Sequence, residues 1–174
     1  MLRILLIQPL LLVFLLSCNF SLASSNYAPI GAKNVQDIRL GGHLLLLEDP
    51  SGTLLVEDLR SPDIAGQFEP LFVDTAYLGR THSVYWFRFQ LDFDAHDSDI
   101  VLELGYPHLK HISLFRFIED ELVDQQKSGY GDSPTSTLEC SRPCFLIPAS
   151  QGIQTLYLRV SSDSPLFVPM SLRD

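Results

Sequence analysis

One segment of the chain carries the residue types that a sugar-binding surface needs. Residues 83–91 alternate in strand geometry, which places Trp86, Arg88 and Gln90 on one face. The opposite face carries the apolar side chains Tyr85, Phe87, Phe89 and Leu91. A flat ring covers the apolar face of a sugar while polar neighbours bind its hydroxyls, so we predict a ligand site on the first face. The alternative is that Trp86 packs in the core and Arg88 pairs with a carboxylate.

Two turn-like segments carry further groups of this kind. Tyr106 and His108 lie at the end of a predicted strand, and Tyr130 and Asp132 lie in the turn cluster 129–134. Loops at the rim of a β fold are common places for ligands to bind. We therefore add these four residues to the predicted ligand site.

An acidic cluster occupies residues 92–99. Calcium prefers several oxygen ligands, which this cluster offers through Asp92, Asp94, Asp97 and Asp99. The cluster has neither the central glycine nor the terminal glutamate of an EF-hand loop, and the alternative is a solvated turn between strands. Calcium is the only cofactor that the sequence suggests.

The sequence offers little support for catalysis or zinc binding. The sequence contains no Gly-x-Ser-x-Gly elbow, no His-Glu-x-x-His and no Walker loop. His108 and His111 are three residues apart, which puts them on opposite faces of a strand and argues against zinc, even with His96 added. A glycosidase needs a pair of carboxylates, and the spacing of the acidic residues does not identify such a pair. We predict a binding protein and no enzyme.

Two cysteines lie close together near the C-terminus. Cys140 and Cys144 would be roughly 13 Å apart in an extended chain, and a disulfide requires about 7 Å or less between the Cα atoms. Arg142-Pro143 is compatible with the turn that closes this gap. We predict a disulfide that fixes the shape of one loop, and the alternative is two reduced thiols.

The N-terminus has the pattern of an export signal. Arg3 precedes an apolar run at 4–16, and small residues follow at Ser21-Leu22-Ala23. The run is shorter than the roughly 20 residues of a membrane span. We predict a signal peptide over 1–23 and an exported product, in which a disulfide would persist. The alternatives are an uncleaved anchor and a lipid anchor at Cys18.

The remaining chain has the size and composition of one folded domain. The full sequence has 46% hydrophobic residues, enough to form a core. Its net charge of −9 argues against nucleic acid as a partner and permits cations, neutral sugars or basic proteins as ligands. We expect an irregular lead-in over 24–39 and a β domain over 40–174. Strands are expected at 43–48, 53–57, 83–91, 99–104, 111–117, 144–148, 154–160 and 165–172.

These strands indicate an all-β fold. The first two strands are predicted to form a hairpin around the turn 49–52. Residues 60–80 are predicted to form a surface loop with a helical turn near 63–65. About eight or nine short antiparallel strands without an amphipathic helix predict a β-sandwich. Two four-stranded sheets in a jelly-roll arrangement suit this count.

Several segments together resemble a known family. They are 47–54, 83–89, 102–107, 111–115, 131–132 and 155–162. In this order they resemble the extracellular sensor domain, type 2, of bacterial seven-transmembrane receptors with diverse intracellular signalling modules. The resemblance covers roughly residues 40–172.

The resemblance implies a jelly-roll domain similar to carbohydrate-binding modules, located in the periplasm or on the cell-envelope exterior of a Gram-negative bacterium. In the family this domain precedes seven membrane helices and an output domain, a histidine kinase or a diguanylate cyclase. The sequence ends at Asp174, about where the first membrane helix is expected. We predict a ligand-sensing domain whose partners are a glycan or small molecule and the receptor's membrane helices. The alternatives are a stand-alone secreted carbohydrate-binding or adhesion protein and a calcium-binding sensor domain.

Overall fold

The two longest strands of the described residues form the centre of a large sheet. The computed structural model describes residues 27–174 except 34, 136–137 and 139. β6 (Val84–Phe93) and β11 (Gly152–Ser161) pair antiparallel along nine residues. The neighbouring strands of the large sheet are β3 (Leu45–Asp49) and β4 (Glu69–Pro70) on one side, β8 (His111–Ile118) and β9 (Glu121–Ser128) on the other, and β1 (Ile30–Gly31), which runs parallel to β6.

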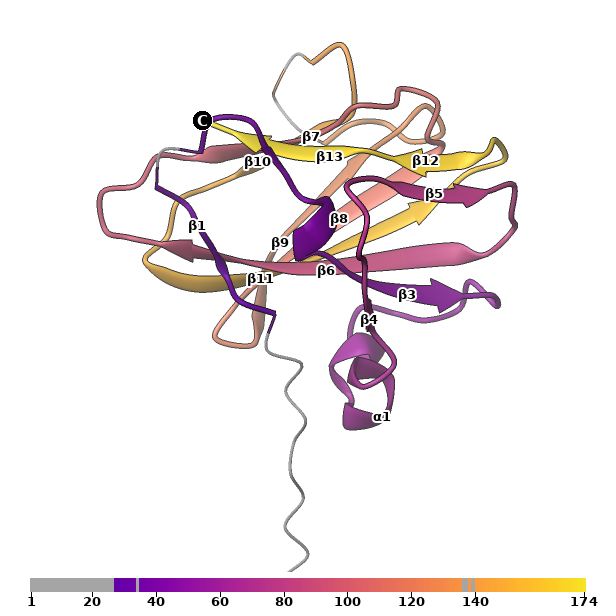
Figure 1. Cartoon of the computed structure of the whole chain (residues 1–174), viewed down its shortest axis with the longest axis horizontal. Helices are drawn as coiled ribbons and strands as arrows, with labels where there is room; N and C mark the ends of the chain where they lie inside the picture. Colours follow the sequence, from indigo (N-terminus) through magenta and orange to yellow (C-terminus); the bar gives the residue numbers. More distant parts are fainter. Residues whose placement is uncertain (1–26, 34, 136–137, 139) are drawn as a thin grey trace, which may run out of the picture.

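A smaller layer faces the large sheet, and the two enclose the main core (Figure 1). In the described residues the small layer consists of a four-stranded sheet and a two-stranded ribbon. The sheet contains, in order, β10 (Cys144–Ile147), β7 (Ile100–Leu104), β13 (Met170–Arg173) and β2 (Ile38–Arg39). The ribbon pairs β12 (Leu166–Val168) with β5 (Ala76–Gly79). The predicted β-sandwich is confirmed, with unequal layers instead of two sheets of four strands.

The strand alternation predicted for residues 83–91 is also confirmed. Phe87, Phe89 and Leu91 are at most 2% exposed and point into the main core between the layers. Leu102 and Leu104 of β7 and Leu172 of β13 meet them from the small layer. Burying this many large apolar side chains is the main driving force for the fold.

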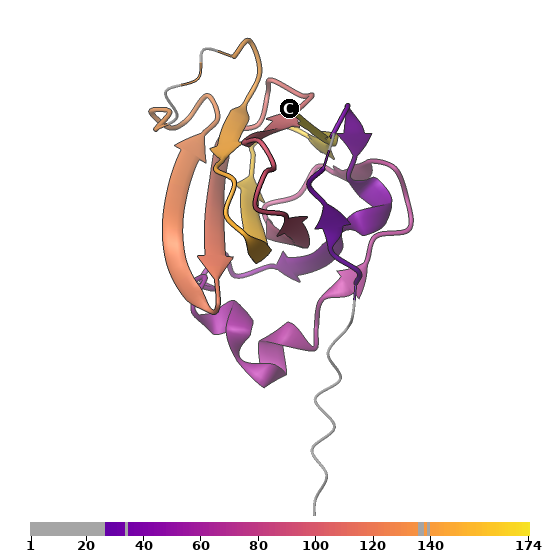
Figure 2. The same cartoon turned by 90° about the vertical axis from the view of Figure 1, so that its left-hand side faces the viewer.

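The opposite face of the large sheet is also covered, by residues 54–68, which we call the covering segment. It contains the 3-10 turn η2 (Asp58–Arg60) and the short helix α1 (Pro62–Ala65), the helical turn predicted near 63–65. It lies on the side of the large sheet away from the small layer (Figures 1 and 2). Together, sheet and segment form an outer cluster of buried residues, namely Leu45, Leu47, Val56, Leu59, Phe68, Val84, Trp86, Phe115, Phe117 and Tyr157.

The predicted hairpin between 43–48 and 53–57 is wrong. β3 pairs with β6 and β4, and residues 53–57 form no strand. The side chain of Asp49 explains the change of direction, because its carboxylate accepts hydrogen bonds from Ser51 Oγ (2.6 Å), Gly52 N (2.8 Å) and Leu54 N (3.0 Å). These bonds hold the backbone in a turn that leads away from the sheet and into the covering segment.

Some strands were missed from the sequence. β9 follows β8 through a two-residue turn at Glu119-Asp120, where both φ angles are positive (46° and 68°). Such turns usually contain asparagine or glycine, so Glu-Asp gave no signal. The lead-in 24–39, predicted as irregular, contributes β1 and β2 because its ends pair with strands of both layers. The predicted last strand is divided at Pro169 into β12 and β13.

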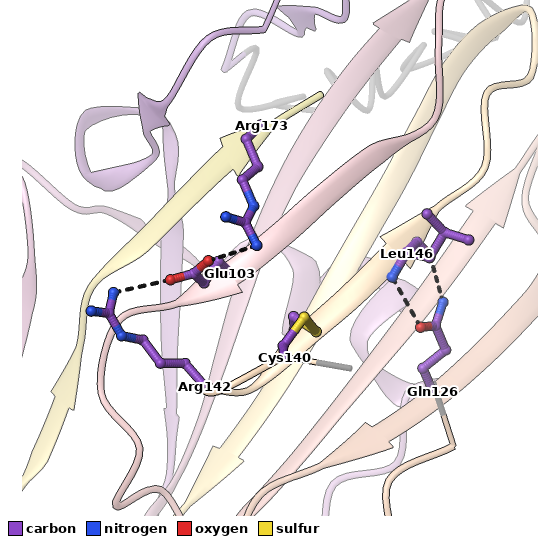
Figure 3. The surroundings of a disulfide bond; sticks show 7 residues. Glu103, Gln126, Cys140, Arg142, Leu146 and Arg173 are labelled. Carbon is purple, nitrogen blue, oxygen red and sulfur yellow. Dashed lines mark hydrogen bonds and ion pairs between the residues drawn. A yellow bond between two sulfur atoms is a disulfide. The ribbon is translucent and has the colours of Figure 1, made fainter. Parts of the chain in front are cut away.

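One glutamine closes the edge of the sandwich between β9 and β10. The Gln126 amide donates to the Leu146 carbonyl (2.6 Å) and accepts from the Leu146 N–H (3.3 Å), as Figure 3 shows. The side chain thus takes the place of a neighbouring strand and joins the two layers at an otherwise open edge.

Replacing Leu59 tests the covering segment. Leu59 is fully buried in the outer cluster, whereas Leu55 in the same segment is 63% exposed. Leu59→Ala should lower the free energy of unfolding by about 2–5 kcal/mol, and Leu55→Ala should change it by less than about 0.5 kcal/mol. Urea denaturation of both variants measures this. Equal stability of the two would contradict the packing.

Replacing Asp49 tests the turn. Burial alone would raise the pKa of Asp49, but hydrogen bonds from Ser51 and from the backbone of residues 52–54 outweigh it and lower the pKa below 3.8. A lowered pKa stabilises the fold above the unfolded-state pKa and loses this contribution as the pH falls through the folded-state value. Asp49→Asn should lower the free energy of unfolding by about 1–3 kcal/mol at pH 7. The difference in this free energy between the variant and the parent chain should shrink below about pH 3.8. Urea denaturation across pH 3–7 checks it, and a constant difference would count against the proposed bonds.

Candidate functional site

The face of β6 predicted to bind a sugar is covered. Trp86 is 1% exposed, and its ring packs against Phe115 at 5.7 Å between centroids. The guanidinium carbon of Arg159 lies 5.8 Å from the Trp86 ring centroid. Stacking of a sugar needs an open ring face, so the prediction of Trp86 as a sugar platform is corrected: Trp86 belongs to the outer cluster.

Arg88 and Gln90 make contacts within the same sheet face. The guanidinium of Arg88 lies 5.8 Å from the ring centroid of Tyr157, and Gln90 Nε2 donates to Thr155 Oγ1 at 3.0 Å. Within the described residues no carboxylate lies within 4 Å of Arg88, so the alternative of an Arg88–carboxylate pair does not hold either. Burial raises the pKa of Tyr157, and the positive charges of Arg88 and Arg60 partly offset this increase. Both predicted residues therefore hold strands together.

Tyr106, which is half-buried, and His108, which is exposed, belong instead to a group of rings on the small layer. Tyr106 meets His108 at 5.4 Å and Phe167 at 5.7 Å, and Phe167 meets Tyr77 at 6.4 Å between centroids. Tyr77 is 71% exposed and Phe167 is 37% exposed. We call these four residues the aromatic patch. It supplies the open ring faces that Trp86 does not.

Tyr77 and Phe167 were missed from the sequence, although each carries a signal. Phe167 stands between the buried Leu166 and Val168, so strand alternation points it outward. Tyr77 follows the buried Ala76 in the same way and is the cross-strand partner of Phe167. Exposed apolar side chains that gather into one patch mark a candidate binding surface. The signal was lost because β5 lies inside the segment read as a loop.

A polar cavity of about 350 Å³ opens beside the aromatic patch. Alternation in β7 and β13 points Glu103 and Ser171, which are cross-strand partners, to the outer face of the small layer. Thr75 directly precedes β5. The cavity is lined by Asp37, Arg39, Asp74, Thr75, Glu103, Gly105, Arg142, Pro169, Met170 and Ser171. Gly105 of the cavity directly precedes Tyr106 of the patch, and Pro169 of the cavity is two residues after Phe167. The cavity and the patch are therefore neighbours along the chain. Rings beside many hydrogen-bonding groups form the candidate functional site.

The predicted disulfide positions part of this cavity. Cys140 and Cys144 are bonded, with 6.2 Å between their Cα atoms, which confirms the prediction. The loop between them carries Arg142, whose Nη1 lies 3.0 Å from Glu103 Oε1 (Figure 3). Arg173 Nη2 lies 3.0 Å from Glu103 Oε2. Glu103 is thus held between two guanidinium groups at the wall of the cavity, and the disulfide restricts one of them.

Tyr130 and Asp132 lie on the loop that packs against residues 109–111. Tyr130 N donates to the Leu109 carbonyl, and Asp132 Oδ2 lies 3.1 Å from His111 Nδ1. Gly129 has φ +104°, and a Cβ there would come within 2.4 Å of the Lys110 carbonyl oxygen, so this close approach requires glycine. Tyr130 is 59% exposed beside these contacts. Both residues lie on a loop next to the patch and do not line the cavity.

An ion pair holds the neighbouring loop at the same end. Lys110 Nζ lies 2.5 Å from Asp163 Oδ2. The hydrogen bond and charge of Asp163 raise the pKa of Lys110, and the hydrogen bond from Lys110 lowers the pKa of Asp163. Ser162 and Ser164 both donate to the His108 carbonyl. These contacts fix the backbone that presents His108 to the aromatic patch.

The acidic cluster does not converge on one point. Asp97 Oδ2 accepts a hydrogen bond from the Asp94 N–H, and Asp99 Oδ1 accepts one from the Ala149 N–H. A cavity of about 220 Å³ beside Asp94 and Asp97 also contains Lys33 in its lining, a poor neighbour for a cation. Among the described residues no three histidine, cysteine or acidic side chains are grouped to hold a metal ion. Calcium binding by Asp92, Asp94, Asp97 and Asp99 stays a prediction without a preformed site.

A cleft of about 680 Å³ lies along β3 and β4, and sequence reasoning missed it. Its walls combine Leu46, Leu71 and Leu78 with Glu48 and Glu69. Burial raises the pKa of Tyr85 at its base, and Glu48 adds to this effect. Tyr85 is only 7% exposed, so the cleft offers no open ring face, and the candidate site on the small layer is the better match to the predicted chemistry.

The comparison with protein families gives one match. A family described as 7TMR-DISM extracellular 2 matches residues 41–174, which is most of the chain. No curated protein matches the sequence. In the described part of the chain, no helix has the length and apolar character needed to cross a membrane. The predicted signal peptide over 1–23 and Cys18 lie outside the described residues.

Removing the disulfide tests how the cavity is held. The loop it closes is short, so Cys140→Ser/Cys144→Ser should cost about 2 kcal/mol of stability. The freed Arg142 should also lose its fixed position, and amide hydrogen exchange at Leu104, whose N–H donates to the Pro143 carbonyl at 2.9 Å, should become faster. Exchange at Gln126 and Leu146 serves as the internal control, because their mutual bonds do not involve the bridge. Unchanged exchange at Leu104 would show that the disulfide does not order this wall.

Proposed function

The chain belongs to the 7TMR-DISM extracellular 2 family, the extracellular sensor domains of transmembrane receptors, and on this premise we propose that the ligand it senses is a carbohydrate. The observation that carries the proposal is the position of the aromatic patch next to the polar cavity, where Gly105 of the cavity directly precedes Tyr106 of the patch. The family consists of receptor domains and is not an enzyme family, which agrees with a binding role.

The two parts of the site suit the two sides of a sugar. The exposed rings of Tyr77 and Phe167 would cover its C–H face, since aromatic rings bind apolar surface with little loss of conformational entropy. Thr75, Ser171 and Arg39 in the cavity would bind its hydroxyl groups. The net charge of −9 disfavours polyanionic glycans and leaves neutral sugars as the preferred class.

Signalling would follow from a ligand that binds one arrangement of the receptor more tightly than another. Such a ligand shifts the balance only by its difference in affinity for the two arrangements. β13 supplies Met170 and Ser171 to the cavity and Arg173 to the Glu103 ion pairs, and it is the last strand of the described residues. In the family the membrane helices follow this domain, so a ligand on β13 would act close to that connection.

The experiment is a glycan array probed with the purified chain, followed by calorimetric titration of the best-binding glycan. Tyr77→Ala and Phe167→Ala should each weaken binding about tenfold, because each removes one stacking surface. Phe72→Ala is the matched control, since Phe72 is 87% exposed but makes none of the ring contacts of the patch. Equal affinities for the patch variants and the parent chain would remove this site, and an array without any bound glycan would remove the ligand class.

A further inference from the structure

A second cavity lies on the other side of the molecule, at the outer face of the large sheet. Its volume is about 280 Å³, and more of its lining is apolar than polar. One wall is the backbone and side chains of residues 52–57, and the floor contains Trp86 and Phe115. Leu55 and Leu122, which are 63% and 43% exposed, stand at its mouth. This cavity shares no residue with the candidate site on the small layer.

Trp86, one of the residues that line this cavity, has an unsatisfied hydrogen-bond donor. Its indole Nε1–H is buried and has no hydrogen-bond acceptor among the described residues. Buried polar groups are nearly always paired, and leaving one unpaired is costly. A ligand oxygen in the cavity that Trp86 lines would remove this cost.

Arg159 brings an unpaired positive charge to the same place. It is half-buried, lines the cavity, and stacks on the Trp86 ring at 5.8 Å. The one hydrogen bond of its guanidinium to the described residues runs from Nη2 to the Gly52 carbonyl at 3.2 Å. No carboxylate in the described part of the chain lies within 4 Å of it, although the sequence contains 21 acidic residues. A partly desolvated guanidinium is best matched by an anion.

We propose that this cavity binds a small carboxylate with an apolar body, such as a short-chain or medium-chain fatty acid. A carboxylate is an acceptor at both oxygens, so it can receive the Trp86 N–H and a guanidinium N–H together. The apolar body would lie against Leu54, Val56 and Phe115 and displace water from Leu55 and Leu122. The proposal stands apart from the carbohydrate proposal, because the two sites lie on opposite layers and would bind ligands of different charge.

Fluorescence titration with octanoate tests the proposal. Trp86 is the only tryptophan in the sequence, so the intrinsic emission reports on this cavity alone. Octanoate should produce a saturable change in the emission. Octylamine, which has a similar apolar body and the opposite charge, should produce none. A linear, unsaturable response to octanoate, or an equal response to octylamine, would overturn the proposal.

Three variants locate the binding. Arg159→Gln should weaken octanoate binding about tenfold or more, because it removes the charge-assisted hydrogen bond. Arg88→Gln is the matched control, since Arg88 is half-buried on the same sheet face but stacks on Tyr157 and does not line the cavity. Leu122→Glu changes an exposed side chain, so it should fold, and its negative charge at the mouth should abolish binding. Octanoate affinity that is the same in Arg159→Gln or Leu122→Glu as in the parent chain would contradict the assignment.

Discussion

Both faces of the large sheet must be kept from water, and this requirement determines how the rest of the molecule is arranged. β6 places Phe87 and Phe89 on one face and Val84 and Trp86 on the other, and all four are buried. A sheet with two apolar faces needs two covers, unlike the usual antiparallel sheet with one wet face. The small layer covers the first face and the covering segment covers the second.

This arrangement decides which surface is left to bind a ligand. The large sheet has no open face in its centre, whereas the small layer buries only its inner face. Its outer face can therefore carry exposed rings and charged groups at little cost in stability. The carbohydrate proposal follows from this difference, because the aromatic patch and the polar cavity lie on the outer face of the small layer, where Tyr77 and Phe167 are exposed.

Charge is distributed in a way that separates the two proposed sites. On the small layer, Glu103 is balanced by Arg142 and Arg173, so that site presents paired charges and neutral hydrogen-bonding groups. On the large sheet, Arg159 has no carboxylate partner in the described part of the chain and lies beside an unpaired indole N–H. A neutral polar ligand suits the first environment and an anion suits the second.

The sequence by itself determined the fold class, the alternation of β6, the disulfide and the family, because each of these depends on local spacing or on motifs in order. It placed Tyr106 and His108 correctly at a rim but misjudged Trp86. Which face of a sheet stays open depends on contacts between residues far apart in the chain, such as Leu59 on Trp86's sheet face. The pairing of Tyr77 with Phe167 joins segments 90 residues apart for the same reason, and only the tertiary structure could bring those rings together.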